Sequence, residues 1–244
     1  ISSSLMVSII FLKLFSKSVP ARLKRNQFIL SKKLFSNIFE VAIPASASPL
    51  LTVGTILVLT GLVGTFGTEA LAGFGIGSRV EFLMIPLIFG IGTAMTSIVG
   101  ANIGANNIER AETVGVYGGS LAGIVSVFIG LTLALFPDLW IQYFTDDPKA
   151  SAVTTMYIQL VGPFYVFQGI GLSLYFASQG ANAMKWPTIA TIARFLIASI
   201  GGSIAIYWLG LGIESIFLSS SIAMMVFGLT IFISIKRGAW RKNS

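Results

Sequence analysis

The sequence predicts an all-α membrane protein built around a bundle of six transmembrane helices. Hydrophobic residues make up 55% of the 244 residues and charged residues only 10%, and the mean hydropathy is +0.87. Soluble domains carry about 25% charged residues, so this composition argues against an aqueous globular protein. The charges also gather at the ends of long apolar runs, which is typical of a polytopic membrane protein.

The composition also narrows the chemistry. The chain has no Cys and no His, which removes disulfides, thiolate catalysis, Cys-type metal sites and imidazole proton relays. The sequence contains no nucleophile elbow, no paired metal ligands and no phosphate-binding loop. We therefore expect no enzyme activity, no cofactor and no metal site. The net charge of +7 does not indicate nucleic-acid binding, because the charges follow the pattern of membrane topology.

Four regions are expected along the chain. Residues 1–12 are apolar but too short to cross a bilayer, and we interpret them as the end of a transmembrane helix whose beginning is missing, which makes the chain a fragment. Residues 13–36 carry seven basic residues and no acidic one, as in a cytoplasmic linker. Residues 37–236 form the six-helix lobe, and residues 237–244 form a cytoplasmic tail.

The first three spans follow from uncharged runs that exceed the roughly 20 residues that one crossing requires. The first is expected at about 38–66, since 28 uncharged residues separate Glu40 from Glu69. The second is expected at about 71–102 and contains most of a run of 27 uncharged residues. The third is expected at about 113–136, ending before Pro137, because proline disfavours helix at the residue that precedes it.

The last three spans come after an acidic loop. The uncharged run 150–184 holds 35 residues, more than one crossing needs, and Gly162 and Pro163 predict that its helix is bent or interrupted. The fifth span is expected at about 188–209, with Arg194 inside it. The sixth is expected at about 216–235 and stops at Lys236 and Arg237.

Small residues within the spans predict where helices pack closely. Gly115, Gly119 and Gly123 recur every four residues, so they share one face of the third span. Such a stripe lets two helix backbones approach each other. The same packing role is expected in the second span for Gly92, Gly100 and Gly104.

The distribution of charge predicts the orientation. If both ends are cytoplasmic, the loops and tail on that side hold 13 of the 16 Lys and Arg residues, whereas the opposite loops hold only Lys149 against five acidic residues. This asymmetry agrees with the positive-inside rule. We therefore expect a multi-pass protein of the plasma (inner) membrane with both ends in the cytoplasm, in contact with the lipid bilayer.

Motifs in the second span resemble the multidrug and toxic compound extrusion (MATE) family of transporters. The motifs are Gly77-Ser78-Arg79-x-Glu81, Pro86, Gly92-Thr93-Ala94 and Val99-Gly100-Ala101-Asn102-x-Gly104-Ala105. A further match is Gln179-Gly180-Ala181-Asn182 with Pro187-Thr188. The family usually has Gln where this chain has Ala101. The resemblance covers about residues 18–238 and implies the C-terminal lobe of a twelve-helix MATE transporter.

The resemblance implies a function for the intact protein. It implies secondary active efflux of multiple drugs or other small organic, often cationic, solutes by antiport of H⁺ or Na⁺, together with a missing N-terminal six-helix lobe. The coupling ion is not expected to be bound by this half alone. Na⁺-coupled relatives carry carboxylates at positions that align with Thr52 and Gln168, which puts ion coupling through those positions in doubt.

Two alternatives to multidrug efflux remain open. One is a lipid-linked oligosaccharide flippase of the same superfamily, although the intramembrane residues Arg79 and Arg194 are few for binding a pyrophosphate. The other is a membrane scaffold subunit that transports nothing. A packed bundle without a polar cleft would favour the scaffold.

The candidate site residues are the polar side chains inside the apolar segments, because such residues are costly in lipid and indicate function or a buried partner. Arg79 and Glu81 lie about 200° apart around a helix and cannot pair face to face. We hypothesise that one of them lines the outward-facing part of a cavity and helps to gate it. The alternative is that both lie near the interface and reach water.

Uncharged polar residues are the candidate contacts for a solute. Gln168, Tyr175 and Gln179 recur at intervals of seven and four, so they share one helical face, and Asn102 ends the second span. A cavity for varied solutes needs apolar walls with a few adaptable hydrogen-bonding groups. The alternative role for these residues is hydrogen bonding between helices.

Overall fold

The computed structural model describes residues 31–241. The first 40 residues form a unit of their own, so the architecture below is that of residues 41–241. The expected helix end at 1–12 and most of the expected linker at 13–36 lie outside the described residues.

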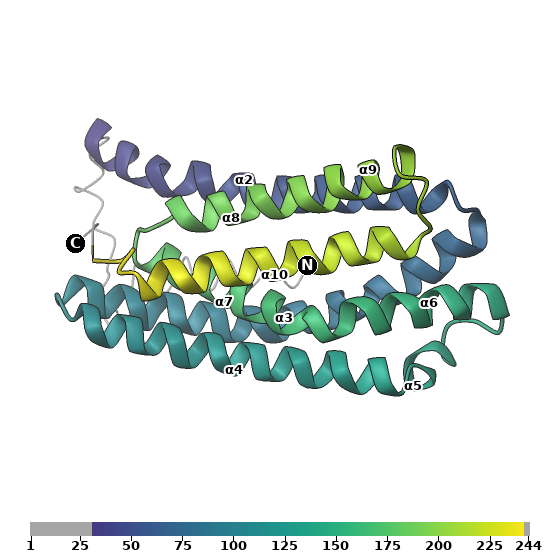
Figure 1. The fold of residues 1–244 in the computed structure, drawn as a ribbon. Coiled ribbons are helices and arrows are strands. Elements are labelled where there is room, and N and C mark those ends of the chain that lie inside the picture. The colour runs from purple at the N-terminus through teal and green to yellow at the C-terminus, as the bar shows by residue number, and fades with distance from the viewer. Residues whose placement is uncertain (1–30, 242–244) are drawn as a thin grey trace, which may run out of the picture. The chain divides into compact units, whose positions relative to one another are not determined.

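All regular structure among the described residues is helical (Figure 1). In chain order the elements are α2 (Lys32–Gly64), α3 (Thr68–Gly104), α4 (Ile108–Leu135), α5 (Asp138–Ile141), α6 (Pro148–Val161), η2 (Gly162–Phe164), α7 (Tyr165–Gly180), α8 (Lys185–Leu196), η3 (Ile197–Gly201), α9 (Gly202–Tyr207) and α10 (Glu214–Lys236). Within residues 31–241, six helical segments are long and apolar enough to cross a membrane. The predicted all-α, six-span fold is therefore confirmed.

Two of the spans are interrupted. In the fourth, α6 and α7 are separated by the 3₁₀ turn η2, which holds Gly162 and Pro163. Proline lacks a backbone N–H and clashes with the preceding turn, and the break lies where these two residues predict it. In the fifth, a five-residue π-helical segment, η3, joins α8 to α9. No pattern in the sequence predicts this π segment, a type of distortion often found at functional sites.

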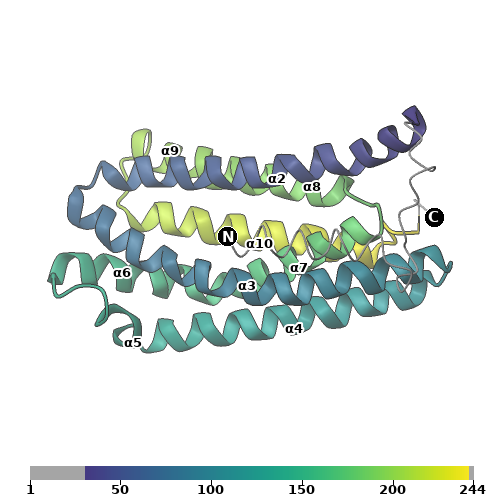
Figure 2. The same cartoon turned by 180° about the vertical axis from the view of Figure 1, so that it is seen from behind.

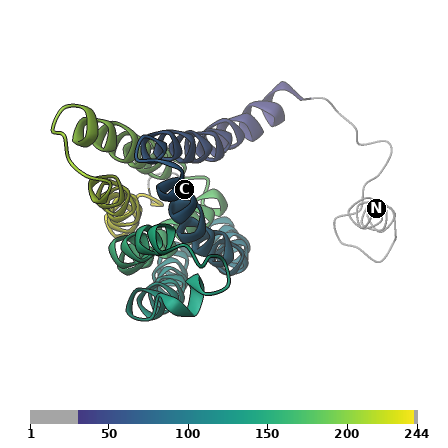
Figure 3. The same cartoon turned by 90° about the vertical axis from the view of Figure 1, so that its right-hand side faces the viewer.

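Helix α7 is at the centre of the packing. It packs most extensively against α3, α4 and α10, and α10 in turn packs against α8. The part of α2 that belongs to this unit, residues 41–64, runs beside α8 and α9 in both views of Figures 1 and 2. Figure 3, which looks along the helices, shows α10 next to α8 and α9. The interior between α2, α3, α6, α7, α8 and α10 is where the candidate site lies.

The glycine stripe of α4 faces close neighbours. Cβ atoms added at Gly115, Gly119 and Gly123 would lie 2.8, 3.2 and 2.8 Å from the side chains of Trp240, Leu174 and Ile170 respectively. Contacts below 3.0 Å require the neighbour to move, so the stripe allows α7 and the C-terminal turn to approach α4.

The three glycines singled out in α3 differ from one another. A Cβ at Gly92 would lie 2.7 Å from Phe176, and one at Gly100 would lie 3.2 Å from the carbonyl oxygen of Gly180. At Gly104 a Cβ would meet no described atom within 4 Å. The expected packing role therefore needs correction at Gly104, because this residue is at the end of α3 and faces open space in the described part of the chain.

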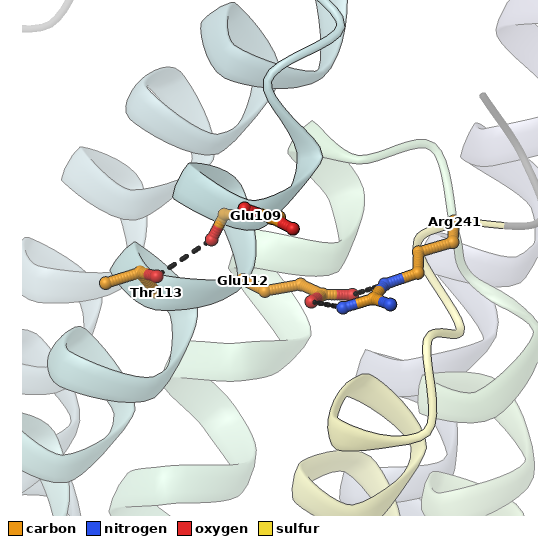
Figure 4. Close-up of polar contacts among 4 residues, drawn as sticks. All are labelled: Glu109, Glu112, Thr113 and Arg241. Carbon is orange, nitrogen blue, oxygen red and sulfur yellow. Dashed lines mark hydrogen bonds and ion pairs between the residues drawn. The ribbon is translucent and has the colours of Figure 1, made fainter.

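The turn after α10 is fastened to the neighbouring helices (Figure 4). The Nε and Nη2 atoms of Arg241 donate to Oε1 and Oε2 of Glu112 at 2.9 and 2.6 Å. The hydrogen bond to Glu112 raises the pKa of Arg241. Trp240 is 1% exposed, and its Nε1 donates to Ser178 Oγ at 3.3 Å. The turn thereby links α10 to α4 and α7.

Candidate functional site

A polar cavity of about 120 Å³ lies inside the helix bundle. Its apolar lining comes from Ile56, Leu59, Phe74, Phe82, Ile85 and Met224. Its polar lining comes from Thr52, Thr55, Ser78, Glu81, Tyr157, Gln168, Arg194 and Ser220. An apolar wall with a few converging polar groups is the usual form of a binding site, and here two of the groups carry opposite charges.

Glu81 is the acidic group of this cavity. It is 13 residues beyond Thr68, the first residue of α3, and therefore roughly 20 Å along the helix axis at about 1.5 Å per residue. The carboxylate is therefore in the membrane-spanning segment of α3, away from both ends of the helix. An ionisable group at this depth needs a partner.

Tyr157 of α6 is that partner. Its hydroxyl donates to Glu81 Oε1 at 2.5 Å. The ring is 2% exposed and makes edge-to-face contacts with Phe74 and Phe217, at centroid distances of 5.5 and 5.1 Å. Such contacts between aromatic rings contribute stabilisation beyond the buried area and keep the hydroxyl directed at the carboxylate.

Arg194 of α8 is the basic group of the cavity. Its guanidinium lies 5.4 Å from the ring centroid of Phe227, and its charge attracts that of Glu81 across the cavity. The two groups do not form an ion pair within 4 Å among the described contacts. Two opposite charges in one cavity each offset part of the free-energy cost of removing the other from water. Because the two groups are not in close contact, space remains between their side chains.

Gln168 adds an uncommitted acceptor. The residue is 4% exposed, and its Oε1 has no hydrogen-bond partner in the described part of the chain. It lies in the first turn of α7, directly after the break at Pro163. A buried polar atom without a partner is costly, so this oxygen is available to a bound ion, water or solute.

The other four predicted site residues lie outside this cavity. Arg79 is exposed on the surface of the lobe, with its guanidinium 5.4 Å from the centroid of the Phe144 ring. Asn102 donates from Nδ2 to the carbonyl oxygen of Ile98 in its own helix. Tyr175 interacts with Ser48 and Gln179. The opposite placement of Arg79 and Glu81 follows from their angular separation around α3.

The residues that sequence reasoning missed are Tyr157 and the cavity role of Arg194. Tyr157 is one of many aromatics in a chain that is 12% Phe, Trp and Tyr, and no local pattern marks it as polar lining. Arg194 was recognised as intramembrane, but it is 113 residues from Glu81 in sequence. The two residues share a cavity only because of how α8 packs in the folded bundle, which the sequence does not indicate.

Comparison with known proteins assigns the chain to a family. The MatE family model matches residues 44–204, which is 161 of the 244 residues. The chain belongs to the MatE family. The matched range includes Glu81, Tyr157, Gln168 and Arg194, and the assignment confirms the resemblance stated for the sequence.

Relatives within the MatE family match most of the chain. A probable multidrug resistance protein NorM of Thermotoga maritima is 27% identical over 230 residues, covering 91% of this chain and 49% of that protein. A probable multidrug resistance protein YpnP of Bacillus subtilis is 25% identical over 210 residues, covering 84% of this chain and 46% of that protein. The chain thus spans about half the length of the curated relatives it matches.

Solved structures support the fold. A MOP superfamily transporter from Pyrococcus furiosus has a TM-score of 0.85 and 23% identity, with 97% of this chain and 54% of that chain covered. A multidrug resistance MATE family transporter in an outward-facing conformation also has a TM-score of 0.85 and 23% identity, with 98% of this chain and 55% of that chain covered. The six-span lobe therefore has the MatE fold, over about half of these longer chains.

Proposed function

We propose that this chain is one lobe of a secondary active exporter that moves small organic, often cationic, solutes outward in exchange for an inward-moving ion. Membership of the MatE family and its relatives' names as probable multidrug resistance proteins support this proposal. The observation that carries it is the polar cavity deep in the bundle, in which Glu81 accepts a hydrogen bond from Tyr157 opposite Arg194.

The coupling ion that we propose is H⁺, and Glu81 is the group of this lobe that takes it up, in place of the expectation from the sequence that this half alone binds no coupling ion. A buried carboxylate can take up a proton, whereas a bound Na⁺ would share the cavity with the positive charge of Arg194. That repulsion disfavours Na⁺. The unpartnered oxygen of Gln168 and the neighbouring hydroxyls would still accept hydrogen bonds from a protonated carboxyl or from water.

Coupling requires that the ion favours one conformation over another. When Glu81 is ionised, it attracts Arg194 and so draws α3 and α8 together. Protonation removes that attraction and leaves Arg194 without its counter-charge, which stabilises a different arrangement of α8 relative to α3. The π segment η3, which directly follows α8, interrupts the regular helix where such a movement would be absorbed.

The solute pathway is proposed to lie between this lobe and a second six-helix lobe. The chain spans about half the length of its relatives, and transporters of this kind alternate access by rocking two repeats around a central site. Tyr175, Gln179 and Asn102 remain proposed solute contacts on this lobe. We propose the plasma membrane as its location, with both ends in the cytoplasm, because of the excess of Lys and Arg at one end.

The test is export by the complete gene product in proteoliposomes under separately imposed H⁺ and Na⁺ gradients, with a fluorescent organic cation as solute. Glu81→Gln should abolish H⁺-driven export while solute binding persists, because the amide resembles the carboxyl in shape but cannot titrate. The matched control is Glu109→Gln, which changes an exposed acid at the end of the bundle. Unchanged export and coupling in Glu81→Gln would refute the proposal.

The two alternatives make different demands on the cavity. A flippase for lipid-linked oligosaccharides would need several basic groups to hold a pyrophosphate, but Arg194 is the one basic residue among the lining residues and it faces Glu81. A scaffold subunit would need no ionisable pair inside the bundle. The balanced charges therefore support the antiporter over both, and pyrophosphate-linked lipid transport by the reconstituted protein would reverse that preference.

A further inference from the structure

A second hollow is on the outside of the lobe, where α10 ends. Its volume is about 500 Å³, within the range of small-ligand sites. It is lined by Trp186 at the start of α8 and by Val226, Leu229, Thr230, Ile233, Ser234, Arg237 and Ala239 of α10 and the turn after it. We call these residues the α8–α10 groove.

The groove is an apolar stripe that ends in a cation. Leu229, Ile233 and Arg237 are spaced four residues apart and therefore follow one face of the helix. Leu229 and Ile233 are 38% and 42% exposed, so the stripe is open to whatever surrounds the lobe. Trp186 borders it at the same end as Arg237 and is 43% exposed.

Arg237 differs from its basic neighbours in having no hydrogen-bond or ion-pair partner among the described residues. Lys236 lies over the ring of Phe232 at 5.6 Å, and Arg241 forms its two hydrogen bonds with Glu112. Within residues 31–241, no hydrogen bond or ion pair is formed by the guanidinium of Arg237. Acidic residues are likewise absent from the lining of the groove.

We infer that the α8–α10 groove binds an anionic phospholipid. Its phosphate lies at Arg237, and one acyl chain follows the stripe past Ile233 and Leu229. Arginine presents a planar set of donors that suits phosphate, and Trp is favoured at the level of lipid headgroups. Basic pockets between transmembrane helices at the positively charged side of a membrane protein bind such headgroups.

The charge pattern favours a lipid over a protein in the groove. A helix from a second lobe or a second copy of the chain would bury Arg237 and would have to bring an acid of its own, because the lining of the groove includes none to compensate that charge. A lipid supplies the missing negative charge and the apolar chain in one molecule. The binding is independent of the proposed export mechanism, because it uses none of the residues of the internal cavity.

The first test compares two neighbouring cations. The complete gene product is titrated with phosphatidylglycerol and with phosphatidylcholine, and the adducts are counted by native mass spectrometry. The parent should bind phosphatidylglycerol more tightly. Arg237→Gln should weaken that binding on the order of tenfold, the effect of losing one charge-assisted hydrogen bond, and should leave phosphatidylcholine binding unchanged. Lys236→Gln is the matched control and should retain the preference.

The second test locates the lipid. Brominated phosphatidylglycerol should quench Trp fluorescence more than brominated phosphatidylcholine does, and Trp186→Phe should remove that difference. The proposal is overturned if Arg237→Gln keeps the lipid preference, or if Lys236→Gln loses it equally, since the attraction would then be diffuse. It is also overturned if neither lipid quenches Trp186, since the groove would then be covered by protein.

Discussion

Tyr157 reaches the carboxylate of Glu81 because residue 77 has no side chain. A Cβ added at Gly77 would lie 2.5 Å from Cδ1 of the Tyr157 ring, closer than such atoms approach in proteins. Gly77 is one turn before Glu81 on the same helix, so the ring packs on the backbone of α3 and its hydroxyl extends to the acid. Gly77 thus positions a polar contact.

Replacement of this glycine should therefore disturb the site. Gly77→Ala is expected to displace the Tyr157 ring, to lower the free energy of unfolding by about 1–3 kcal/mol through overpacking, and to reduce H⁺-driven export as Tyr157→Phe does. The control is Gly75→Ala, two residues away in the same helix, where a Cβ would meet no described atom within 4 Å. That change should be neutral or slightly stabilising. Equal behaviour of the two variants in thermal melting and transport would disprove this role for Gly77.

The opposite charges of Glu81 and Arg194 should be coupled. Removal of one member of a buried pair leaves the other uncompensated and costs about 3–5 kcal/mol, whereas removal of both costs less. Glu81→Gln and Arg194→Gln are each expected to lower the melting temperature in detergent. The double variant should recover part of that loss, giving a non-additive cycle. It should still fail to couple export to a proton gradient, because no titratable group remains between the two helices.

Additivity of the two changes would contradict the coupling. The melting temperatures must be measured on the same preparation of complete gene product, in one detergent, so that bound lipid does not differ. Arg194→Lys provides a second comparison, because it keeps the charge and removes the planar group that lies over Phe227. It is expected to preserve more stability than Arg194→Gln.

The positions of the membrane-spanning helices could be predicted from the sequence, because they depend on hydrophobicity averaged over long segments. The uncharged runs, the proline after α4 and the Gly162–Pro163 break each have a local physical cause, and all appear within a few residues of their expected positions. The short helix α5 was not anticipated, since four residues in an acidic loop give no periodic signal. The π segment η3 was missed for a similar reason, because Ile197–Gly201 reads as ordinary apolar helix.

The site was accessible only in part. The cost of an ionisable group in the membrane singled out Glu81, and the spacing of polar residues along one face of the fourth span singled out Gln168; both line the cavity. The same reasoning could not decide whether Glu81 or Arg79 faces the interior of the bundle. The helical period places the two residues on opposite faces of α3, but it does not indicate which face is buried. The contact with Tyr157 is 76 residues away in sequence, and it depends on how α6 lies against α3.

The C-terminal turn should be stabilised by its tryptophan more than by its ion pair. Trp240 is almost fully buried against Gly115 and Ser178, and truncation of a buried aromatic costs about 3–5 kcal/mol. Arg241 is 60% exposed in its pair with Glu112, and such surface pairs contribute about 0–1 kcal/mol. Trp240→Ala should therefore lower the melting temperature far more than Arg241→Ala does. Comparable losses would mean that the ion pair, not the packing, holds the turn in place.

Arg79 should matter little to coupling although it is two residues from Glu81. Its side chain is exposed on the lobe and lies over Phe144, and an exposed cation–π contact contributes about 0.5–1 kcal/mol. Arg79→Gln is expected to shift the melting temperature slightly and to leave the proton dependence of export as in the parent, in the same assay in which Glu81→Gln loses it. A loss of coupling in Arg79→Gln would move the titrating interaction to the outer face of α3. The internal cavity would then have to be abandoned as the place where the proton acts, because in the described part of the chain Arg79 is connected to the cavity lining only through the backbone of α3.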